Sequence, residues 1–499
     1  MVIGRRAVVL GGSVAGLCAA GAVAPYFDEV IVLERDSLPA DAEHRRGVPQ
    51  SKHPHFMLNS GRRAIEQLFP GFEAALIAAG GRKLNPSLDA AYCEAVGWAP
   101  RKSGSMTMVY GSRILIERVL RDMARTLANV TIRENVVVSG IETAGAGTAD
   151  GRVTGVRVQD EVLAADLVID AMGRGSSVPA WLVAAGWSEA PVRSLDAKVA
   201  YSSMWYQLPP ERPASWWWQH LAIMPNQKKG AHPEEHDYLV NFFPIEGDRA
   251  IACMGAWGLE LPKKTDAFVE AAERIRTPVF AAAMKQCEQL SEVHLTRSTG
   301  NKWRRYDLAV DAPLGFVAIG DAICAFNPFY GQGMSSAARS AVILADRLSE
   351  STVLDRGFFR SFLDRQRKSL DVPWMLAIAR DQGYEHATGT EIASPLRRRI
   401  SAALVWPVFN LITAAAREDD VVEDHFARVF NLDESMTDMA KNPRVLAGLL
   451  RYKLKLMFGR EKMPRSFDIQ LDPPATDYTP DTTVGRKSAT GTRKKAMAR

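Results

Sequence analysis

The sequence of 499 residues lacks the features that mark disulfide-stapled, zinc-binding or membrane-spanning proteins. Its five cysteines are odd in number, widely spaced and never form a C-x-x-C pair, so neither a disulfide framework nor a zinc site is indicated. We interpret them as small buried apolar residues in a reducing compartment. No apolar run approaches the roughly 18 residues of a membrane span. The longest, residues 402–416, contains Pro407.

The net positive charge of the chain resides in its C-terminal tail. The net charge is +5, but residues 485–499 hold six Lys or Arg and no acid, so the rest of the chain carries a net charge of −1. This balance argues against a basic nucleic-acid groove in the folded part. A tail rich in Gly, Ser, Thr and Ala cannot form a core, and we predict that residues 471–499 are disordered. A weak contact of this tail with a membrane or a nucleic acid is the alternative.

The glycine- and alanine-rich stretch VVLGGSVAGLCAAGAVAP, residues 8–25, could be an export signal or part of a nucleotide site. The second interpretation also explains a helix over residues 14–26 and a second apolar strand that ends at Glu34. Small residues let the backbone approach a pyrophosphate, and the helix N-terminus attracts it. Glu34, 23 residues after Gly11, is placed to accept hydrogen bonds from ribose hydroxyls. The stretch therefore predicts a βαβ dinucleotide unit in which Ser13 replaces the second glycine of G-x-G-x-x-G.

Two later segments repeat the pattern of an apolar strand that ends in an acid and a glycine turn. ADLVIDAMGRGSS, residues 165–177, places Asp170 at the end of such a strand. GFVAIGDAICAFNPFYGQG, residues 315–333, stops at Gly320-Asp321 and then opens a long helix with glycines. A carboxylate beside a helix N-terminus pairs a hydroxyl acceptor with a site that favours anions.

In this order and spacing, the three segments resemble the FAD-dependent monooxygenases with the para-hydroxybenzoate-hydroxylase type of fold. The resemblance implies an α/β protein: an FAD-binding Rossmann-like domain, an inserted antiparallel-sheet substrate domain and a C-terminal helical region. It implies FAD as the cofactor and one oxygen atom inserted from O2 through a flavin C4a-hydroperoxide. The residues it assigns to FAD are Gly11, Gly12, Ser13, Val14, Ala15, Gly16, Glu34, Arg35, Val137, Asp170, Gly173, Asp321, Pro328, Gly331, Gly333 and Met334.

Two segments are similar to a narrower group, the flavin epoxidases of polyether pathways such as those of monensin and lasalocid. They are HRRGVPQSKHPH, residues 44–55, and FNPFYGQGMSSAARSA, residues 326–341. This similarity places Arg45 and Gln50 near the flavin, and gives Arg113 a cofactor contact at the start of a helix. The alternative for Arg113 is a charge on a helix surface.

Residues 198–261 alternate in polarity and are rich in aromatics, which predicts an antiparallel sheet. The resemblance makes this sheet a wall of the substrate pocket, and we name Trp216, Trp218, Phe326, Phe329 and Tyr330 as candidate pocket residues. The tryptophans could instead fill the sheet's own core. The spacing of WWWQHLAIMP differs from the W-x-W-x-x-I-P motif of flavin halogenases, so halogenation is not favoured.

The chain is predicted to divide into FAD-binding segments at 1–85, 107–190 and 296–370, substrate-sheet segments at 86–106 and 191–295, and helices at 371–470. Only one dinucleotide site is visible, so NAD(P)H or a separate flavin reductase must supply electrons. The basic amphipathic stretch RVLAGLLRYKLKLMFGR, residues 444–460, could rest on a membrane or pack on the first domain. A cytoplasmic location, with possible membrane contact, is expected.

No acid–base pair that could activate a phenol is announced by the sequence, and no catalytic residue is assigned. His53 and His55 are the nearest candidates, although a local structural role fits them better. Because attack on an alkene needs no protein base, this absence favours alkene epoxidation of a hydrophobic substrate. The alternatives are aromatic hydroxylation, flavin-dependent reduction of an isoprenoid double bond, and a non-catalytic flavin- or lipid-binding protein.

Overall fold

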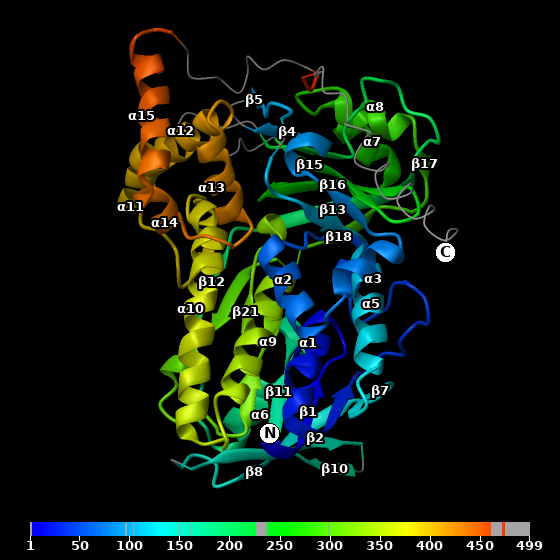
Figure 1. Ribbon diagram of the computed structural model, residues 1–499, viewed down its shortest axis with the longest axis vertical. Coiled ribbons are helices and arrows are strands. Elements are labelled where there is room, and N and C mark those ends of the chain that lie inside the picture. Colours follow the sequence, from blue (N-terminus) through cyan, green and yellow to red (C-terminus); the bar gives the residue numbers. More distant parts are fainter. Residues whose placement is uncertain are drawn as a thin grey trace, which may run out of the picture.

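The computed structural model describes residues 2–460 and 472–474, with gaps at 95–96, 103, 149, 160, 226–236 and 298. The described part has a parallel-sheet region at one end, a largely antiparallel sheet at the other, and a helical region beside the latter (Figure 1). The predicted fold class is therefore confirmed. The predicted disorder of residues 471–499 falls almost entirely outside the described residues.

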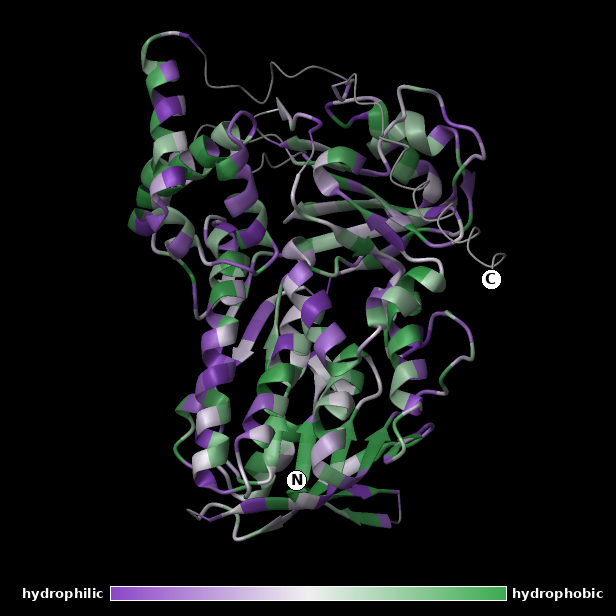
Figure 2. Cartoon of the chain, viewed as in Figure 1, coloured by the Kyte–Doolittle hydropathy of each residue, from purple (hydrophilic) through white to green (hydrophobic). Residues whose placement is uncertain are grey.

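Five parallel strands form the core of the first region, in the order β20-β11-β1-β2-β7. Short β-branched runs build them, because buried parallel strands are apolar on both faces. Val8, Val9 and Leu10 of the central strand are all 0% exposed, and Figure 2 shows this sheet as strongly hydrophobic. The strands are β1 Gly4–Leu10, β2 Phe27–Leu33, β7 Val130–Arg133, β11 Leu167–Asp170 and β20 Phe316–Ala318.

Helices cover one face of this sheet, and a three-stranded antiparallel sheet covers the other. Ala7 and Val9 face the helices, whereas Val8 and Leu10 face the small sheet. The helices are α1 Val14–Val23, α2 Asn59–Leu68, α3 Phe72–Ala78, α5 Arg113–Arg125, α9 Gly333–Ser349 and α10 Arg356–Asp381. A further helix, α6 Val178–Ala185, packs on the side of the small sheet, against β8. The small sheet consists of β8 Val138–Ala144, β9 Arg152–Val158 and β10 Glu161–Ala164.

The second region is an eight-stranded sheet in the order β17-β13-β16-β15-β14-β4-β5, with β18 beside β13. Its long antiparallel strands confirm the sheet predicted over residues 198–261. The alternation of side chains gives it two faces: Phe242 packs under α7 and α8, and Phe243 faces the opposite way. The elements are β4 Ala90–Glu94, β5 Gly97–Trp98, β13 Val199–Gln207, β14 His220–Ile223, β15 Leu239–Ile245, β16 Arg249–Trp257, β17 Glu288–Gln289, β18 His294–Thr296, α7 Thr265–Glu273 and α8 Val279–Lys285.

Short elements connect the two sheets. One four-stranded sheet has the order β21-β19-β12-β22, and a separate pair joins β3 to β6. These elements are β3 Arg82–Leu84, α4 Pro86–Asp89, β6 Met108–Tyr110, β12 Val192–Asp196, β19 Asn301–Arg304, β21 Cys324–Ala325 and β22 Thr388–Gly389.

The C-terminal region is helical and has its own small core. Val422, Val429, Val445 and Tyr452 are its most buried large residues. The predicted boundary at residue 371 lies inside α10, which continues through Pro373. The helices are α11 Pro395–Ile400, a π-helical turn Ser401–Val405, α12 Trp406–Ala416, α13 Asp420–Phe430, α14 Met436–Lys441 and α15 Pro443–Met457.

One helix of this region passes a test for a membrane span that no apolar run of the sequence passes. The continuous helix Pro395–Ala416 has 22 residues and, by length and composition, is apolar enough to cross a membrane. The sequence estimate was too short for two reasons. The helix begins before the apolar run, and Pro407 lies in the first turn of α12, directly after the π-helical turn, where a missing N–H is tolerated. Among the cysteines, four are buried as expected and Cys287 is partly exposed.

Candidate functional site

The three predicted motifs meet at the carboxyl edge of the parallel sheet. β1, β11 and β20 are neighbours that end together, since Leu10 pairs with Asp170 and Asp170 pairs with Ala318. A Cβ atom added to Gly320 would lie 2.8 Å from the Cβ of Ala15 in α1, so the first and third motifs touch. Segments that are about 150 residues apart in the sequence therefore form one site.

Glycine is required twice in the first turn. Gly11 has φ +103°, and a Cβ there would lie 2.8 Å from the carbonyl oxygen of Ala171. A Cβ on Gly16 would lie 1.8 Å from the carbonyl oxygen of Gly11, which no side chain can tolerate. The turn therefore feeds directly into α1, whose first residues are Val14 and Ala15. The unpaired N–H groups of this first helical turn point out of the sheet edge.

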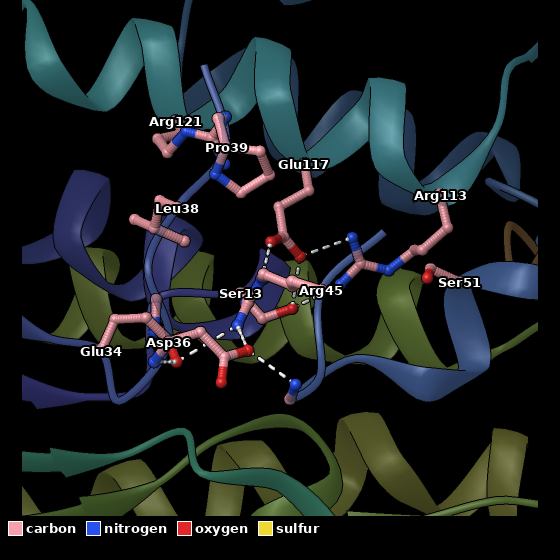
Figure 3. Close-up of polar contacts among 12 residues, drawn as sticks. Ser13, Glu34, Asp36, Leu38, Pro39, Arg45, Ser51, Arg113, Glu117 and Arg121 are labelled. Carbon is pink, nitrogen blue, oxygen red and sulfur yellow. Dashed lines mark hydrogen bonds and ion pairs between the residues drawn. The ribbon is translucent and has the colours of Figure 1, made fainter. Parts of the chain in front are cut away.

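A buried ionic cluster lies beside this turn (Figure 3). Glu117, on α5, accepts hydrogen bonds from the Ser13 hydroxyl at 2.7 Å and from Arg45 Nε at 2.8 Å. Arg113, one turn earlier on α5, donates to Ser13 Oγ at 2.6 Å and lies 3.0 Å from Glu117 Oε2. Glu34 accepts from the Gly12 amide at 2.8 Å. Ser13 thus connects the glycine turn to both Arg113 and Glu117 of α5.

The charges of this cluster are nearly balanced. Arg45 also contacts Asp36 at 2.8 Å and Glu34 at 3.1 Å, so two arginines face three carboxylates. Burial opposes the charge on Glu117, but the guanidinium groups of Arg113 and Arg45 outweigh it and hold its pKa below the usual value. Burial lowers the pKa of the Arg113 guanidinium, with Glu117 opposing that shift. Arg45 Nη2 has no hydrogen-bond partner among the described residues.

The N-terminus of α9 forms the other end of the site. Gly331 has φ +65°, and a Cβ on Gly333, the first residue of the helix, would lie 3.7 Å from Asp321 Oδ1. The Asp321 side chain is 39% exposed and therefore open to a ligand. Gln332 is 1% exposed, yet neither its amide nitrogen nor its amide oxygen has a partner among the described residues. A buried, unpartnered amide at a helix N-terminus is a hydrogen-bonding group that a bound water, ion or ligand can satisfy.

The other predicted cofactor residues divide into two groups. Asp170 is fully buried and holds its own turn, because Ser176 Oγ donates to it at 2.6 Å and Met172 N at 3.0 Å. Burial raises its pKa to about 6. Gly173 begins that turn and Met334 is buried in the core. Arg35, Gln50, Val137 and Pro328 are exposed.

Trp216 and Trp218 do not face the cofactor edge, which corrects their assignment to the substrate pocket. Their rings lie 5.0 Å apart and both pack edge-on to Phe242, at 5.9 Å. That face of the sheet is covered by α7 and α8. The tryptophans precede β14 and fill this outer core together with Phe268 of α7 and Phe280 of α8.

On the cofactor side, the structure joins polar residues that the sequence keeps far apart. His220 Nδ1 lies 3.2 Å from the Tyr92 hydroxyl and 3.3 Å from the Tyr110 hydroxyl. His220 Nε2 lies 3.2 Å from Asn241 Oδ1, so Nε2 carries the proton and Nδ1 accepts one. Burial lowers the pKa of His220 to about 4 and raises the pKa of both tyrosines. No local pattern could have revealed this cluster.

This polar cluster lies next to the α9 loop. The ring of Phe56 packs against His220 at 5.4 Å and against Phe243 at 4.8 Å. A Cβ on Gly331 would lie 2.7 Å from the Cβ of Phe56. One aromatic ring therefore separates the polar cluster from the loop that opens α9.

The predicted pocket residues of that loop lie between the two sheets and the C-terminal helices. Phe329 packs 5.1 Å from Trp257, and Tyr330 packs 6.0 Å from Phe430 of α13. Phe326 is only 4% exposed and belongs to the core. The loop is anchored by Asn327, whose side-chain amide donates to Asp381 at the end of α10.

Sequence reasoning missed several residues of this site. Glu117 had a detectable signal, because it lies four residues after Arg113 and so on the same helix face. Gln332 stands between two predicted glycines, but nothing local shows that its amide is buried. His53 and His55 have structural partners instead: His53 Nδ1 bonds Ser203 Oγ at 2.8 Å, and His55 Nδ1 bonds the His53 carbonyl at 2.9 Å.

These features fit an extended dinucleotide. Two helix N-termini, α1 and α9, lie at one sheet edge, with arginines at one end and an unpartnered amide at the other. A diphosphate matches the first end, and a heterocycle with hydrogen-bonding edges matches the second.

No protein-family model matches the chain. A curated relative, Protein Rv3254 of Mycobacterium tuberculosis, is 29% identical over 469 residues, which cover 90% of this chain and 95% of the relative.

Solved structures of low sequence identity share the architecture. The flavin-dependent brominase Bmp2 has a TM-score of 0.62 and 13% identity, covering 92% of this chain and 100% of its own. A flavoprotein/dehydrogenase from Cytophaga hutchinsonii has a TM-score of 0.61 and 15% identity, covering 91% and 100%. The p-nitrophenol 4-monooxygenase PnpA from Pseudomonas putida DLL-E4 has a TM-score of 0.57 and 17% identity, covering 87% and 99%.

The chain has the fold of the flavin-dependent monooxygenases. Bmp2 and PnpA carry out different reactions according to their descriptions, so this likeness identifies the architecture and leaves the reaction to the site.

Proposed function

We propose that this protein is an FAD-dependent monooxygenase that inserts one oxygen atom from O2 into a hydrophobic small molecule, with alkene epoxidation as the reaction. The main support is the convergence of residues 11–16, 170–173 and 320–334 at one sheet edge between two helix N-termini. The proposal includes NAD(P)H or a separate flavin reductase as the electron source, and a cytoplasmic location.

The chain's residues have separable roles in this proposal. Ser13, Arg45 and Arg113 would hold the diphosphate, and Glu34 the ribose. Asp321, Gln332 and the N-terminus of α9 would hold the polar parts at the other end. When bound, FAD supplies the redox chemistry that activates O2. The aromatic residues around the α9 loop exclude water and orient an apolar substrate.

Aromatic hydroxylation is a second candidate, and one observation favours it. Oxygen transfer to a phenol needs help from a base, and the sequence announces none. The fold, however, places Tyr92 and Tyr110 on the free Nδ1 of a neutral His220. Such a cluster can hydrogen-bond a substrate hydroxyl and orient it for oxygen transfer. The cluster weakens the argument for epoxidation that was drawn from the missing base.

The first test is the absorption spectrum of the purified protein, which is expected to show flavin bands, with FAD released on denaturation. A protein that binds no flavin under any condition would refute the whole proposal. Substrate-dependent O2 consumption with NAD(P)H then separates a monooxygenase from a double-bond reductase and from a non-catalytic binder.

The two oxygenation reactions are separated by product analysis. ¹⁸O from labelled O2 is expected in an epoxide, and its appearance in a phenol would establish the second candidate. The variants Tyr92→Phe and Tyr110→Phe separate the two reactions further. Epoxidation should keep its pH profile in both variants, whereas phenol hydroxylation should lose kcat and shift its pH optimum.

A further inference from the structure

The C-terminal helices carry two stripes of exposed apolar side chains. On the continuous helix Pro395–Ala416, the first stripe consists of Leu396, Ile400, Leu404 and Val408, at a spacing of four residues and 48–68% exposed. On α15, the second stripe consists of Leu446, Leu450, Leu454 and Met457, which are 41–70% exposed. Side chains spaced by three and four residues lie on one face of a helix. Each helix therefore presents an unpartnered apolar face.

The two helices are neighbours and are fixed by the same small core. α12 and α15 pack against each other and against α13, through Ile412, Val422 and Tyr452. Both lie at the left edge of the molecule in Figure 1. Figure 2 shows apolar and polar residues interspersed along α15. The second half of α12 is buried and only the first half of the long helix is exposed, which suits a helix lying on a surface better than one crossing a bilayer.

Basic side chains border these stripes. Arg397 and Arg399 flank Leu396 and Ile400, and Arg444 and Lys453 flank the stripe of α15; all four are exposed. None of the four forms an ion pair within the described residues. Arg451 and Lys455 of the same helix are instead paired with Asp419 and Glu418. Apolar stripes edged by unpaired cations match the interface of a bilayer that contains anionic lipids.

A continuous line of aromatic rings connects this surface with the candidate site. Starting inside, Tyr330 of the α9 loop lies 6.0 Å from Phe430, and Phe430 lies 4.8 Å from Phe426 on α13. Phe426 lies 5.8 Å from Phe409, which lies 5.4 Å from Trp406 at the start of α12. The line ends at Trp406, directly after Leu404 and Val405, which are 64% and 58% exposed.

We infer that the first half of the helix Pro395–Ala416 and the outer face of α15 dock on an anionic bilayer surface, and that the site takes a substrate dissolved in that bilayer. The docking stands independently of the reaction. The substrate class rests on the proposed function. We infer that the substrate enters the site along the line of aromatic rings. The basic residues 485–499 add charge of the same sign.

Vesicle flotation of the full-length protein tests the docking. The protein is expected to float with vesicles of phosphatidylcholine containing phosphatidylglycerol, and less with phosphatidylcholine alone. Leu404→Glu and Leu450→Glu should each weaken the partition by about tenfold, because each removes one apolar anchor and adds a like charge. Val310→Glu is the matched control, since Val310 is 94% exposed in a loop of the parallel-sheet region.

Each other outcome overturns the docking. Wild-type protein that stays with the bulk solution, or Leu→Glu variants that float like wild type, would exclude these faces as the contact. A dimer seen by light scattering and dissociated by Leu450→Glu would show that a second copy covers the surface. The flavin spectrum of every variant, recorded without vesicles, keeps this result separate from the cofactor proposal.

The entry route has its own readout. Phe426→Glu in the middle of the aromatic line should raise KM for a vesicle-borne substrate at least tenfold, while FAD affinity stays unchanged. An equal effect on a water-soluble substrate analogue would contradict a route from the bilayer.

Discussion

The cofactor edge and the polar cluster of the substrate wall are both buried and both rely on hydrogen-bonded side chains, but they are built differently. At the edge, Gly11, Ser13 and Gly16 come from one turn, so a short stretch of sequence determines the local geometry. The wall draws Tyr92, Tyr110, His220 and Asn241 from four strands that meet only after folding. Steric limits on the backbone determine the structure of the edge, whereas hydrogen bonds between side chains determine that of the polar cluster.

The largest effect is expected at the edge, from Gly16→Ala. Its Cβ would lie 1.8 Å from a backbone oxygen, and the turn cannot move without shifting β1, so the free energy of unfolding should fall by at least about 3 kcal/mol. Urea denaturation measures this. Gly175→Ala is the control, because its Cβ would meet nothing within 4 Å, and a comparable loss there would refute the steric argument.

Arg113→Met comes next. The variant leaves Glu117 buried with one guanidinium fewer, which should lower the free energy of unfolding by about 3 kcal/mol and also weaken FAD binding. Arg118→Met, on the same helix but more exposed, should change stability by less than about 0.5 kcal/mol. Adding Glu117→Leu to Arg113→Met should restore stability without restoring FAD affinity. Recovery of both would mean that neither residue holds the cofactor.

His220 gives the substrate wall a pH signature. Because its folded pKa is about 4 and the unfolded value is 6.5, only the unfolded chain gains a proton between these values, so stability falls as the pH decreases through this window. Between pH 7 and pH 5 the loss from this residue is about 2 kcal/mol. His53 and His55 add losses of the same sign, and Asp170 opposes them.

The comparison that isolates His220 is therefore wild type against His220→Gln, in which the other groups cancel. The difference in unfolding free energy should change with pH over this window. Parallel curves for the two proteins would show that the imidazole is not buried in its neutral form.

The smallest effect on activity is expected from Trp216→Phe. Because Trp216 packs on the outer face of the sheet, KM should stay within twofold of wild type while the free energy of unfolding falls by about 1 kcal/mol. Phe329→Leu, in the α9 loop, should raise KM severalfold instead. A larger change in KM for Trp216→Phe than for Phe329→Leu would show that Trp216 lines the substrate pocket after all.

These contrasts explain what the sequence could predict. The βαβ unit, the strand-end acids and the antiparallel sheet arise from patterns over fewer than about 30 residues, which spacing and periodicity reveal. The convergence of Ser13 with Glu117 requires α5 to pack beside α1, and the contact of His220 with Tyr92 depends on the register of β14 against β4. Contacts between side chains of distant strands produce no periodic pattern in the sequence, so they could not be predicted from it.

The long helix α10 gives these parts a common support. Its 26 residues form a rod of about 39 Å. Asp381 at its end accepts hydrogen bonds from Trp257 on the substrate sheet, Asn301 on a connecting strand and Asn327 on the α9 loop. A tilt of this helix would displace Asp381 and so strain all three hydrogen bonds at once. Events at the helical end of the molecule are thereby mechanically linked to the loop that opens α9.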